Sequence, residues 1–571
     1  MIKVVNIIPK SLSNETGQDS EPNIAVNPAN SQQIAITAFT KDPLGGANAP
    51  IFVSTNGGSN WSLNSIVPSQ AGSTTGTGDI TSRFGGGNRF YAGILRVPFG
   101  LRLNILRTTN FSGAAVMSVL LNQTTSQKDQ PYTQAQADGS GKDHLYVGCN
   151  DFGASGGKTA TIEQSQDAGA ASPTFTAARI EKRNTSGQNG PQIRPAAHSN
   201  GTVYGIFYGW RSFVSSQVTA DVTVVRDDSW GKGATPFTSL KDPSDSIAGR
   251  LVAKNVKFTW NGTLGHERLG GDLSIAVDPN NSSTVYIAYC DLQGSVYTMH
   301  VRRSLDKGVT WSADLKTVSN CKNPALAINS SGLVGICYQR VTGSGSSERW
   351  ETHLETSSNG FTTSNNMVLA TVPTSAPTPT FLPYIGDYIH MMCVGTSFYG
   401  VFSANNTPDN SNFPQGVTYL RNADFATKKL LGVNGTTQIS ASIDPFFFQY
   451  TPLVTVTHLT HISLFTPFTF FTVVGPGHPP PGGPVEGLEP SAPVEPFIRF
   501  GNHIFSPEEL DLARFEPLSG VVGELANIGI TRLHQLALCS PDSLAVQLGY
   551  PRPDASRLVD LAQRLLRSLT M

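Results

Sequence analysis

The residues best placed to do chemistry are acidic side chains at the start of short apolar segments: Glu21, Asp79, Asp129, Asp272 and Asp387. Asn323 and Gly190 hold corresponding places in two further segments. Carboxylates crowded in a cleft raise one another's pKa, so that one can act as a general acid beside an ionised partner. They could instead bind a divalent cation. We therefore select Glu21, Asp79, Asp272 and Asp387 as candidate catalytic residues, and Asp129 as a candidate binding residue.

Arginines and aromatic residues in or near the same segments add candidate binding groups. Arg83 and Arg194 could bind an anion, because a planar guanidinium group pairs with a carboxylate through two hydrogen bonds. Stacking against a sugar ring could come from aromatic residues, namely Tyr388, Tyr132, Tyr384 and Trp210. A structural role is the alternative for every one of these residues. Acidic groups at strand starts often accept backbone amides, and aromatic rings often pack between sheets.

The acidic residues belong to a segment that recurs along the chain. Its copies begin at Glu21, Gly78, Asp129, Gly190, Gly271, Asn323 and Gly386. Each copy is followed by a stretch in which apolar residues alternate with others and Tyr and Val are frequent, which indicates a β-strand. A regular recurrence of this length is typical of a repeat protein.

A turn motif follows each strand pair and is complete once, as Ser304-x-Asp306-x-Gly308-x-Thr310-Trp311. In such a turn Ser304 and Asp306 can bond nearby backbone amides, Gly308 can adopt a positive φ, and Trp311 can cover the hairpin. Six incomplete copies begin at Val53, Arg107, Gln164, Arg226, Thr356 and Arg421. We expect these residues to stabilise the fold and to take no part in binding.

Seven repeats in constant order predict a mainly β chain with a seven-bladed β-propeller over residues 1–450. The innermost strands of a propeller converge, so the acidic residues should surround one mouth of the central channel. The ring must also be closed. We expect the apolar run from Lys3 to Ile8 to complete the last blade beside Gln438 to Phe448.

The complete turn motif resembles the Asp-box, or bacterial neuraminidase repeat, of the sialidase-like superfamily. That resemblance implies a propeller in which the box caps a hairpin within each blade, but it implies little about chemistry. Sialidases have six blades, an Arg-Ile-Pro segment in the first blade, three arginines that hold the substrate carboxylate, a Tyr nucleophile with a Glu partner, and an Asp acid/base. Here residues 21–24 read EPNI without arginine, and the similar string LRVP at 95–98 follows the first box. The catalytic set is therefore not carried over.

The chain changes character beyond residue 450. Residues 451–474 are rich in Thr, Phe and β-branched side chains, but two prolines and two histidines make them a poor membrane-spanning helix, which favours an apolar β-rich extension. Residues 475–496 predict a Pro-rich linker.

Residues 497–571 predict a small all-α domain. Ser506-Pro507 and Ser540-Pro541 are typical helix starts, and the last helix carries an apolar stripe. The stretch from Leu525 to Thr531 resembles a helix-hairpin-helix turn. The tail is balanced in charge, which favours a protein partner over nucleic acid.

Whole-chain composition excludes several classes. The 571 residues carry 40 Lys plus Arg and 41 Asp plus Glu, so no overall field would attract nucleic acid or anionic lipid. The first ten residues lack a secretory signal, so we expect a cytoplasmic protein or one exported by a non-classical route. The six cysteines form no C-x-x-C pair and are expected as small buried hydrophobes.

Two functions remain open, and we favour the first over the second. The first is a recognition or scaffold propeller that binds a glycan or protein through one face and is docked to a larger assembly by its helical tail. The second is a sialidase-like glycoside hydrolase with a rearranged acidic site. The missing arginines, the incomplete boxes and the linker favour the first, whereas the acidic mouth favours the second. No cofactor is expected beyond a cation that this mouth could bind.

Overall fold

A computed structural model describes residues 2–39, 51–68, 78–96, 102–124, 127–154, 159–183, 193–259, 272–375 and 385–452, with shorter stretches between 473 and 568. The chain divides into two compact units, Met1–Leu453 and Val454–Met571. Each unit has a hydrophobic core of its own.

The first unit is built from antiparallel sheets. Six of them consist of four strands that follow one another in the sequence, so each sheet corresponds to one predicted repeat. The first sheet consists of β2 (Ser20–Asn27), β3 (Asn30–Phe39), β4 (Ile51–Ser54) and β5 (Ser62–Asn64), and the second of β6 (Ile80–Phe84), β7 (Phe90–Arg96), β8 (Arg102–Thr108) and β9 (Ser118–Asn122). The third consists of β10 (Lys128–Ala137), β11 (Asp143–Asp151), β12 (Ala160–Ser165) and β13 (Thr176–Arg179), and the fourth of β14 (Arg194–Ala197), β15 (Val203–Val214), β16 (Gln217–Asp227) and β17 (Arg250–Thr259). The fifth consists of β18 (Leu273–Asp278), β19 (Asn281–Gln293), β20 (Val296–Ser304) and β21 (Lys316–Ser319), and the sixth of β22 (Cys321–Ile328), β23 (Val334–Thr342), β24 (Arg349–Ser357) and β25 (Asn365–Pro373).

A further sheet joins the two ends of this unit. Its order is β26 (His390–Val394), β27 (Ser397–Asn405), β32 (Ile443–Tyr450), β1 (Ile2–Asn6) and β28 (Thr418–Tyr419). A small sheet of β29 (Ala423–Asp424), β30 (Lys429–Leu431) and β31 (Gln438–Ile439) lies between β28 and β32 in the sequence. Short 3-10 turns cover Lys10–Leu12, Gly345–Ser347 and Asn410–Asn412.

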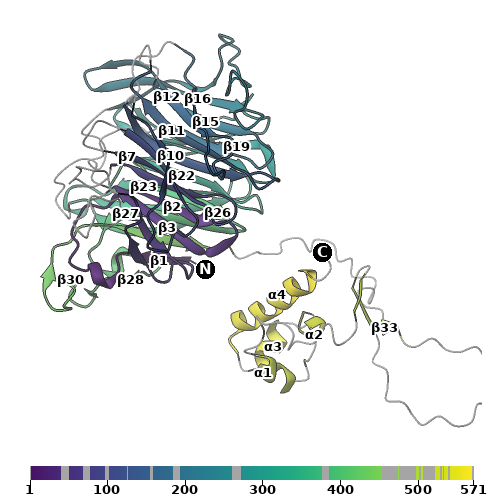
Figure 1. The fold of residues 1–571 in the computed structure, drawn as a ribbon. Helices are drawn as coiled ribbons and strands as arrows, with labels where there is room; N and C mark the ends of the chain where they lie inside the picture. Colours follow the sequence, from purple (N-terminus) through teal and green to yellow (C-terminus); the bar gives the residue numbers. More distant parts are fainter. Residues whose placement is uncertain are drawn as a thin grey trace, which may run out of the picture. The chain divides into compact units, whose positions relative to one another are not determined.

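The first strands of the sheets form a closed cycle. Strand β2 contacts β6, and the contacts continue through β10, β14, β18, β22 and β26 back to β2. The sheets are thus arranged like the blades of a propeller (Figure 1). Side chains tie neighbouring first strands together: the backbone N–H of Thr133 donates to Thr81 Oγ1 at 2.9 Å, and that of Leu326 donates to Ser274 Oγ at 2.9 Å.

The N-terminal strand closes the cycle as the sequence predicted. Strand β1 pairs antiparallel with β32, with Ile2 opposite Tyr450 and Asn6 opposite Phe446. The predicted partner began earlier in the chain, at Gln438, but that residue belongs to β31. Half of the residues of β32 are aromatic, and Phe446, Phe447 and Phe448 are fully buried.

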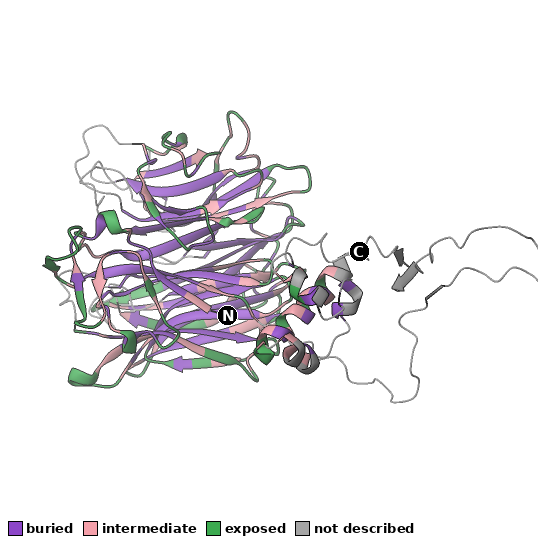
Figure 2. Ribbon diagram, turned by 90° about the horizontal axis from the view of Figure 1, so that it is seen from below, coloured by how far each residue is buried: buried purple, intermediate pink, exposed green. Residues whose placement is uncertain are grey.

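Packing between the sheets accounts for the core of the first unit, whose strands are predominantly buried (Figure 2). Alternate side chains of a strand point to opposite faces of its sheet, and both faces meet a neighbouring sheet. Apolar residues therefore occupy both faces, as in β7, where all seven residues are buried. Cys149, Cys290 and Cys337 are buried as predicted, whereas Cys393 is only half-buried.

The complete turn motif is held by its own side chains. Ser304 Oγ accepts the backbone N–H of Gly308 at 2.8 Å, Asp306 Oδ1 accepts that of Thr310 at 2.9 Å, and Trp311 Nε1 donates to the Gly308 carbonyl at 3.0 Å. The same bonds recur in the turn that begins at Ser54, whose Trp61 is buried. Trp311 is only half-buried.

Residues 497–571 are not entirely helical, in contrast to the prediction. Strands β34 (Phe497–Phe500) and β35 (His503–Phe505) form a hairpin that pairs with β33 (Val473–Val474). The reason is visible in the sequence, since FIRF and HIF are aromatic and β-branched stretches around Gly-Asn, a turn dipeptide.

Four helices follow: α1 (Val522–Asn527), α2 (Leu533–Ala537), α3 (Pro541–Leu548) and α4 (Arg552–Ser568). On α4 the predicted stripe faces the core, with Ala555, Val559 and Ala562 buried. The linker 475–496, the helix start at Ser506 and most of the turn between α1 and α2 lie outside the described residues. No helix in the described part of the chain is long and apolar enough to cross a membrane.

Candidate functional site

The cycle of first strands encloses a cavity of about 460 Å³. Polar side chains on its wall come from β6, β10, β14, β18, β26 and the segment that leads into β26, namely Arg83, Tyr132, Gln134, Gln136, Arg194, Ser274, Tyr388 and His390. The rest of the wall is formed largely by small aliphatic residues. Among the described residues that line the cavity, two are arginines and none is Asp or Glu. The cavity wall is therefore cationic.

Arg194 is held in place by two aromatic rings. It begins β14, it is 4% exposed, and its guanidinium carbon lies 4.1 Å from the ring centre of Tyr132 and 5.1 Å from that of Tyr388. Its Nη2 lies 3.7 Å from Asp272 Oδ1. A guanidinium group stacked in this way is fixed in orientation before a ligand arrives, which lowers the entropic cost of binding.

Arg83 is the second cation of the wall. Its Nε and Nη2 donate to Gln134 Oε1 at 3.1 and 2.9 Å, and its Nη1 donates to Met392 Sδ at 3.1 Å. Burial lowers the pKa of Arg83, against the effect of Tyr132. Amide and thioether partners do not neutralise the guanidinium group, so its charge is available to an anion.

His390 lies beside Arg83 and was not selected from the sequence. Its Nδ1 lies 3.2 Å from the backbone nitrogen of Ile24 and 3.1 Å from Asn23 Nδ2, both in β2. Its ring meets Tyr132 edge-on at 5.6 Å between centres. Burial, followed by the charges of Arg83 and Arg194, lowers the pKa of His390 well below its usual value, so the ring is neutral at pH 7.

The predicted carboxylates lie near the cavity without lining it. Glu21, Asp79, Asp272 and Asp387 are all buried, with exposed fractions of 1 to 3%. Glu21 Oε1 accepts the backbone N–H of Asp387 at 3.3 Å, which ties β2 to the segment before β26. This is the structural role that the sequence analysis left open.

Asp272 is the carboxylate that faces Arg194 of the cationic wall. Its Oδ1 accepts the backbone N–H of Leu273 at 2.7 Å. Burial raises the pKa of Asp272 to about 7, although Arg194, the Leu273 N–H and Lys322 act to lower it. The buried carboxyl is thus a group that can be protonated near neutral pH.

Tyr388 lines the cavity and also lies close to two of the buried carboxylates. It is 2% exposed, and its hydroxyl group has no hydrogen-bond partner among the residues that the structure describes. Burial, Asp79 and Glu21 raise the pKa of Tyr388 well above its usual value. The hydroxyl therefore remains protonated and can donate to a ligand.

The strand starts have a strained backbone at three places. Glu21, Gln130 and Asn323 have φ of 53°, 56° and 54°, and each precedes a proline at a bulge. A positive φ is uncommon for such residues and is kept where surrounding contacts enforce it. The residue that matches Glu21 in the third sheet is thus Gln130, the neighbour of the predicted Asp129. Asp129 is half-buried, and its Oδ1 accepts the Gln130 N–H at 2.9 Å.

The remaining predicted groups fall elsewhere. Trp210 is buried against Phe213 and Phe258, so it packs within its own sheet. Tyr384 and Gly190 lie outside the described residues. The structure thus brings Arg83, Arg194 and Tyr388 together on one wall and adds Gln134 and His390. Both added residues stand two positions after a selected aromatic, a period-2 signal that could have identified them.

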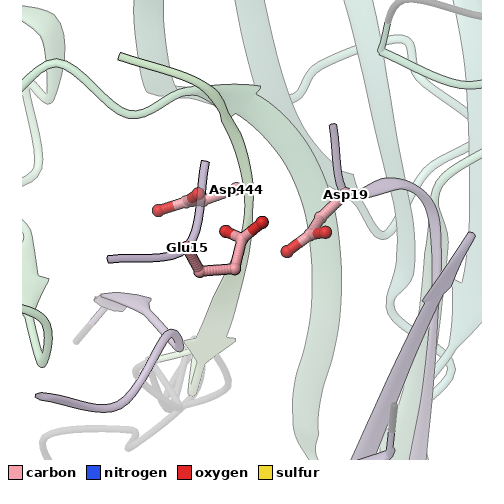
Figure 3. Close-up of side chains that lie close together, drawn as sticks. All are labelled: Glu15, Asp19 and Asp444. Atoms are coloured by element: carbon pink, nitrogen blue, oxygen red, sulfur yellow. The ribbon is translucent and has the colours of Figure 1, made fainter. Parts of the chain in front are cut away.

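Carboxylates come within metal-binding range of one another at a different place. In the described ranges, Glu15, Asp19 and Asp444 are the one group of three or more such ligands, with their atoms within 4.8 Å (Figure 3). Arg421 Nη1 donates to both oxygens of Asp444, at 3.0 and 2.7 Å. Burial and Asp444 raise the pKa of Glu15 to about 7. Arg421 and a proton on Glu15 can therefore offset two of the three negative charges of this group.

Comparison with known proteins leaves the family open. No family model matches the chain, and no curated protein matches its sequence. Solved structures with similar folds include an α-L-arabinofuranosidase of Fusarium graminearum in complex with an iminosugar inhibitor, at 8% identity over 78% of this chain and 97% of that chain, with a TM-score of 0.36.

Two other solved structures are similar to the same degree. A protein of unknown function from Dyadobacter fermentans is 10% identical over 78% of this chain and 97% of its own, with a TM-score of 0.37. Drosophila Semaphorin 2a is 9% identical over 69% of this chain and 73% of its own, with a TM-score of 0.35. These values assign neither a family nor an activity to the chain.

Proposed function

We propose that the first unit is a seven-bladed, Asp-box-type β-propeller whose central cavity binds a carboxylate-bearing glycan. One observation carries this proposal: Arg83 and Arg194 lie on a cavity wall that includes no Asp or Glu among the described residues. Guanidinium groups bind carboxylates through paired, charge-assisted hydrogen bonds. The rings of Tyr132 and Tyr388 offer an apolar face and a hydroxyl group to a sugar.

Variants of the two arginines test the proposal on a glycan array. Arg83→Gln and Arg194→Gln should each weaken binding of acidic glycans, because a hydrogen bond to a charged group contributes about 1.5–3 kcal/mol, or roughly ten- to a hundredfold in affinity. Arg211→Gln is the matched control, since Arg211 pairs with Asp221 away from the cavity wall. Absence of any acidic glycan among the ligands of the folded wild type would refute the proposal.

A second candidate function is glycoside hydrolysis at the same cavity. It is favoured by Asp272, whose pKa is raised to about 7 by burial, and by the hydroxyl of Tyr388 near Asp79 and Glu21. A carboxyl that keeps its proton near neutral pH can act as a general acid. Hydrolysis of a fluorogenic sialoside that is lost in Asp272→Asn would support an enzyme. Tight binding without hydrolysis would support recognition alone.

For the second unit we propose a docking role toward a protein partner, with residues 475–496 as the linker. The support is its own core, formed around α2, α3 and α4, which makes it a separate folding element. Co-purification of tagged residues 497–571 with a partner that the first unit does not retain would test this role.

A further inference from the structure

The hydrogen bonds of His390 determine where its proton lies. The backbone nitrogen of Ile24 carries a hydrogen and can only donate, and it lies 3.2 Å from His390 Nδ1. The Nδ1 atom must therefore be the acceptor. In a neutral imidazole ring the proton then lies on Nε2.

Asn23 confirms this assignment independently. Its Oδ1 accepts the backbone N–H of Ser82 at 2.8 Å, which fixes the orientation of the amide group. Its Nδ2 is consequently the atom that faces His390 Nδ1, at 3.1 Å, and it too can only donate. Two donors converge on Nδ1, so a proton there would face two other hydrogens. Both Asn23 and His390 are at least 96% buried, so solvent does not disturb the arrangement.

The opposite ring nitrogen, Nε2, then carries the proton and faces a second hydrogen-bond donor. His390 Nε2 lies 3.4 Å from Arg83 Nη2, and a guanidinium group has no acceptor. Two N–H donors side by side form no hydrogen bond, and both belong to residues of the cavity wall. An acceptor atom placed against both would satisfy them at once.

We propose that His390 is a specificity-determining residue of the cavity, and that one oxygen of a ligand carboxylate binds between His390 Nε2–H and Arg83 Nη2. This inference rests on the proposed function and names the ligand group that the site selects. A carboxylate oxygen accepts from both donors, whereas an ammonium group would face two donors and be rejected.

Two substitutions of His390 distinguish the role of Nδ1 from that of Nε2. His390→Asn keeps an acceptor near the position of Nδ1, so the bonds from Ile24 and Asn23 can persist, but it removes the Nε2 donor. His390→Gln places an amide near the position of Nε2 but removes the Nδ1 acceptor. We expect His390→Asn to melt near the wild-type temperature and to bind glucuronate at least tenfold more weakly, whereas His390→Gln should lose stability and retain more of the affinity.

The tautomer itself can be measured in the full-length protein by nitrogen-15 NMR of labelled histidine. The His390 signal is the one missing from His390→Asn, and His198→Asn provides the assignment control. We expect Nε2 protonated and Nδ1 unprotonated at pH 7, with the Nε2–H signal moving on titration with sodium acetate. A proton on Nδ1, an Nε2–H signal that acetate leaves unchanged, or unaltered glucuronate affinity in a folded His390→Asn would overturn the inference.

The two proposals fail differently. If acetate moves the Nε2–H signal but no acidic glycan binds, the oxyanion site stands and the glycan function is wrong. If acidic glycans bind and Arg83→Gln weakens them while His390→Asn does not, the glycan function stands and the role of His390 is wrong.

Discussion

At the scale of single residues, His300 shows how two acidic neighbours shift the pKa of a buried histidine. It is 3% exposed, with Nε2 3.0 Å from Asp291 Oδ1 and Nδ1 2.9 Å from Asp314 Oδ2. Burial acts to lower its pKa, but the bonds to Asp291 and Asp314 outweigh burial, and the pKa is raised. The folded state therefore binds this proton more tightly than the unfolded chain, whose histidine pKa is about 6.5.

This difference predicts a pH-dependent stability. A raised folded pKa contributes stability that is complete below the unfolded pKa and is lost as pH rises through the folded pKa. The free energy of unfolding of the wild type should thus exceed that of His300→Gln most at about pH 6, and the difference should shrink by pH 9. Urea denaturation of both proteins at several pH values measures it, and a pH-independent difference would contradict the prediction.

The turn motif provides a second prediction, in which Ser304 and Asp306 behave differently. Ser304 is 1% exposed and accepts the buried N–H of Gly308, whereas Asp306 is exposed and bonds the exposed N–H of Thr310. Ser304→Ala should therefore cost about 1–3 kcal/mol, because it leaves a buried donor without a partner. Asp306→Ala should cost less, because the Thr310 N–H that Asp306 accepts is exposed to solvent.

Chemical denaturation of the two variants gives the comparison directly. Asp306→Asn serves as the control, since its amide oxygen can still accept the Thr310 N–H. Equal losses of unfolding free energy for Ser304→Ala and Asp306→Ala would show that the exposure of the backbone N–H does not determine how much its hydrogen bond stabilises the turn. Glycan binding should be unaffected in all three, because the turn residues do not line the cavity.

At the scale of elements, β1 holds the two ends of the first unit together. Beyond its ladder with β32, Asn6 Nδ2 donates to Asp444 Oδ2 at 2.7 Å, and Arg421 Nη2 donates to the Ser13 carbonyl at 3.0 Å. These bonds cross more than 400 residues of sequence. A ring closed in this way depends on its last strand for cooperativity.

Removal of this strand is expected to be severe. A chain without residues 1–10 should lose the β1 ladder and expose the edge of β32. Its melting temperature should fall by well over 4 °C, which is the shift that roughly 1 kcal/mol produces in a smaller domain. Arg421→Met is a milder test of the same link between the two ends of the unit. It should lower the free energy of unfolding by about 3–5 kcal/mol, because Asp444 stays buried without its cation. An unchanged melting temperature in either protein would show that β1 and Arg421 do not hold the two ends of the unit together.

At the scale of the whole molecule, the two units should fold independently. Each has its own core, and the boundary between the two units lies at Leu453 and Val454. Residues 1–453 alone should reproduce the melting temperature and the glycan binding of the first unit. Limited proteolysis should cut the full chain between 475 and 496, and resistance there would indicate that this stretch is packed.

The sequence by itself determined the features that depend on neighbouring residues. The strands, the order of the repeats, the turn around Ser304 and helix α4 follow from local periodicity and turn chemistry, which act over a few residues. The pairing of β1 with the last strands followed from the need to close a repeat ring. The hairpin at 497–505 was missed, although its aromatic residues and turn dipeptide are also local signals.

Only the tertiary structure decided the composition of the candidate site. Sequence position grouped Glu21, Asp79, Asp272 and Asp387 with the arginines, because all stand near strand starts. The fold instead leaves Arg83 and Arg194 on the cavity wall and places the carboxylates outside it. His390 owes its tautomer to Asn23 and Ile24, which are 367 and 366 residues away in the sequence. Such contacts arise from the closure of the ring, which brings the first and last sheets together, and no local pattern of residues encodes them.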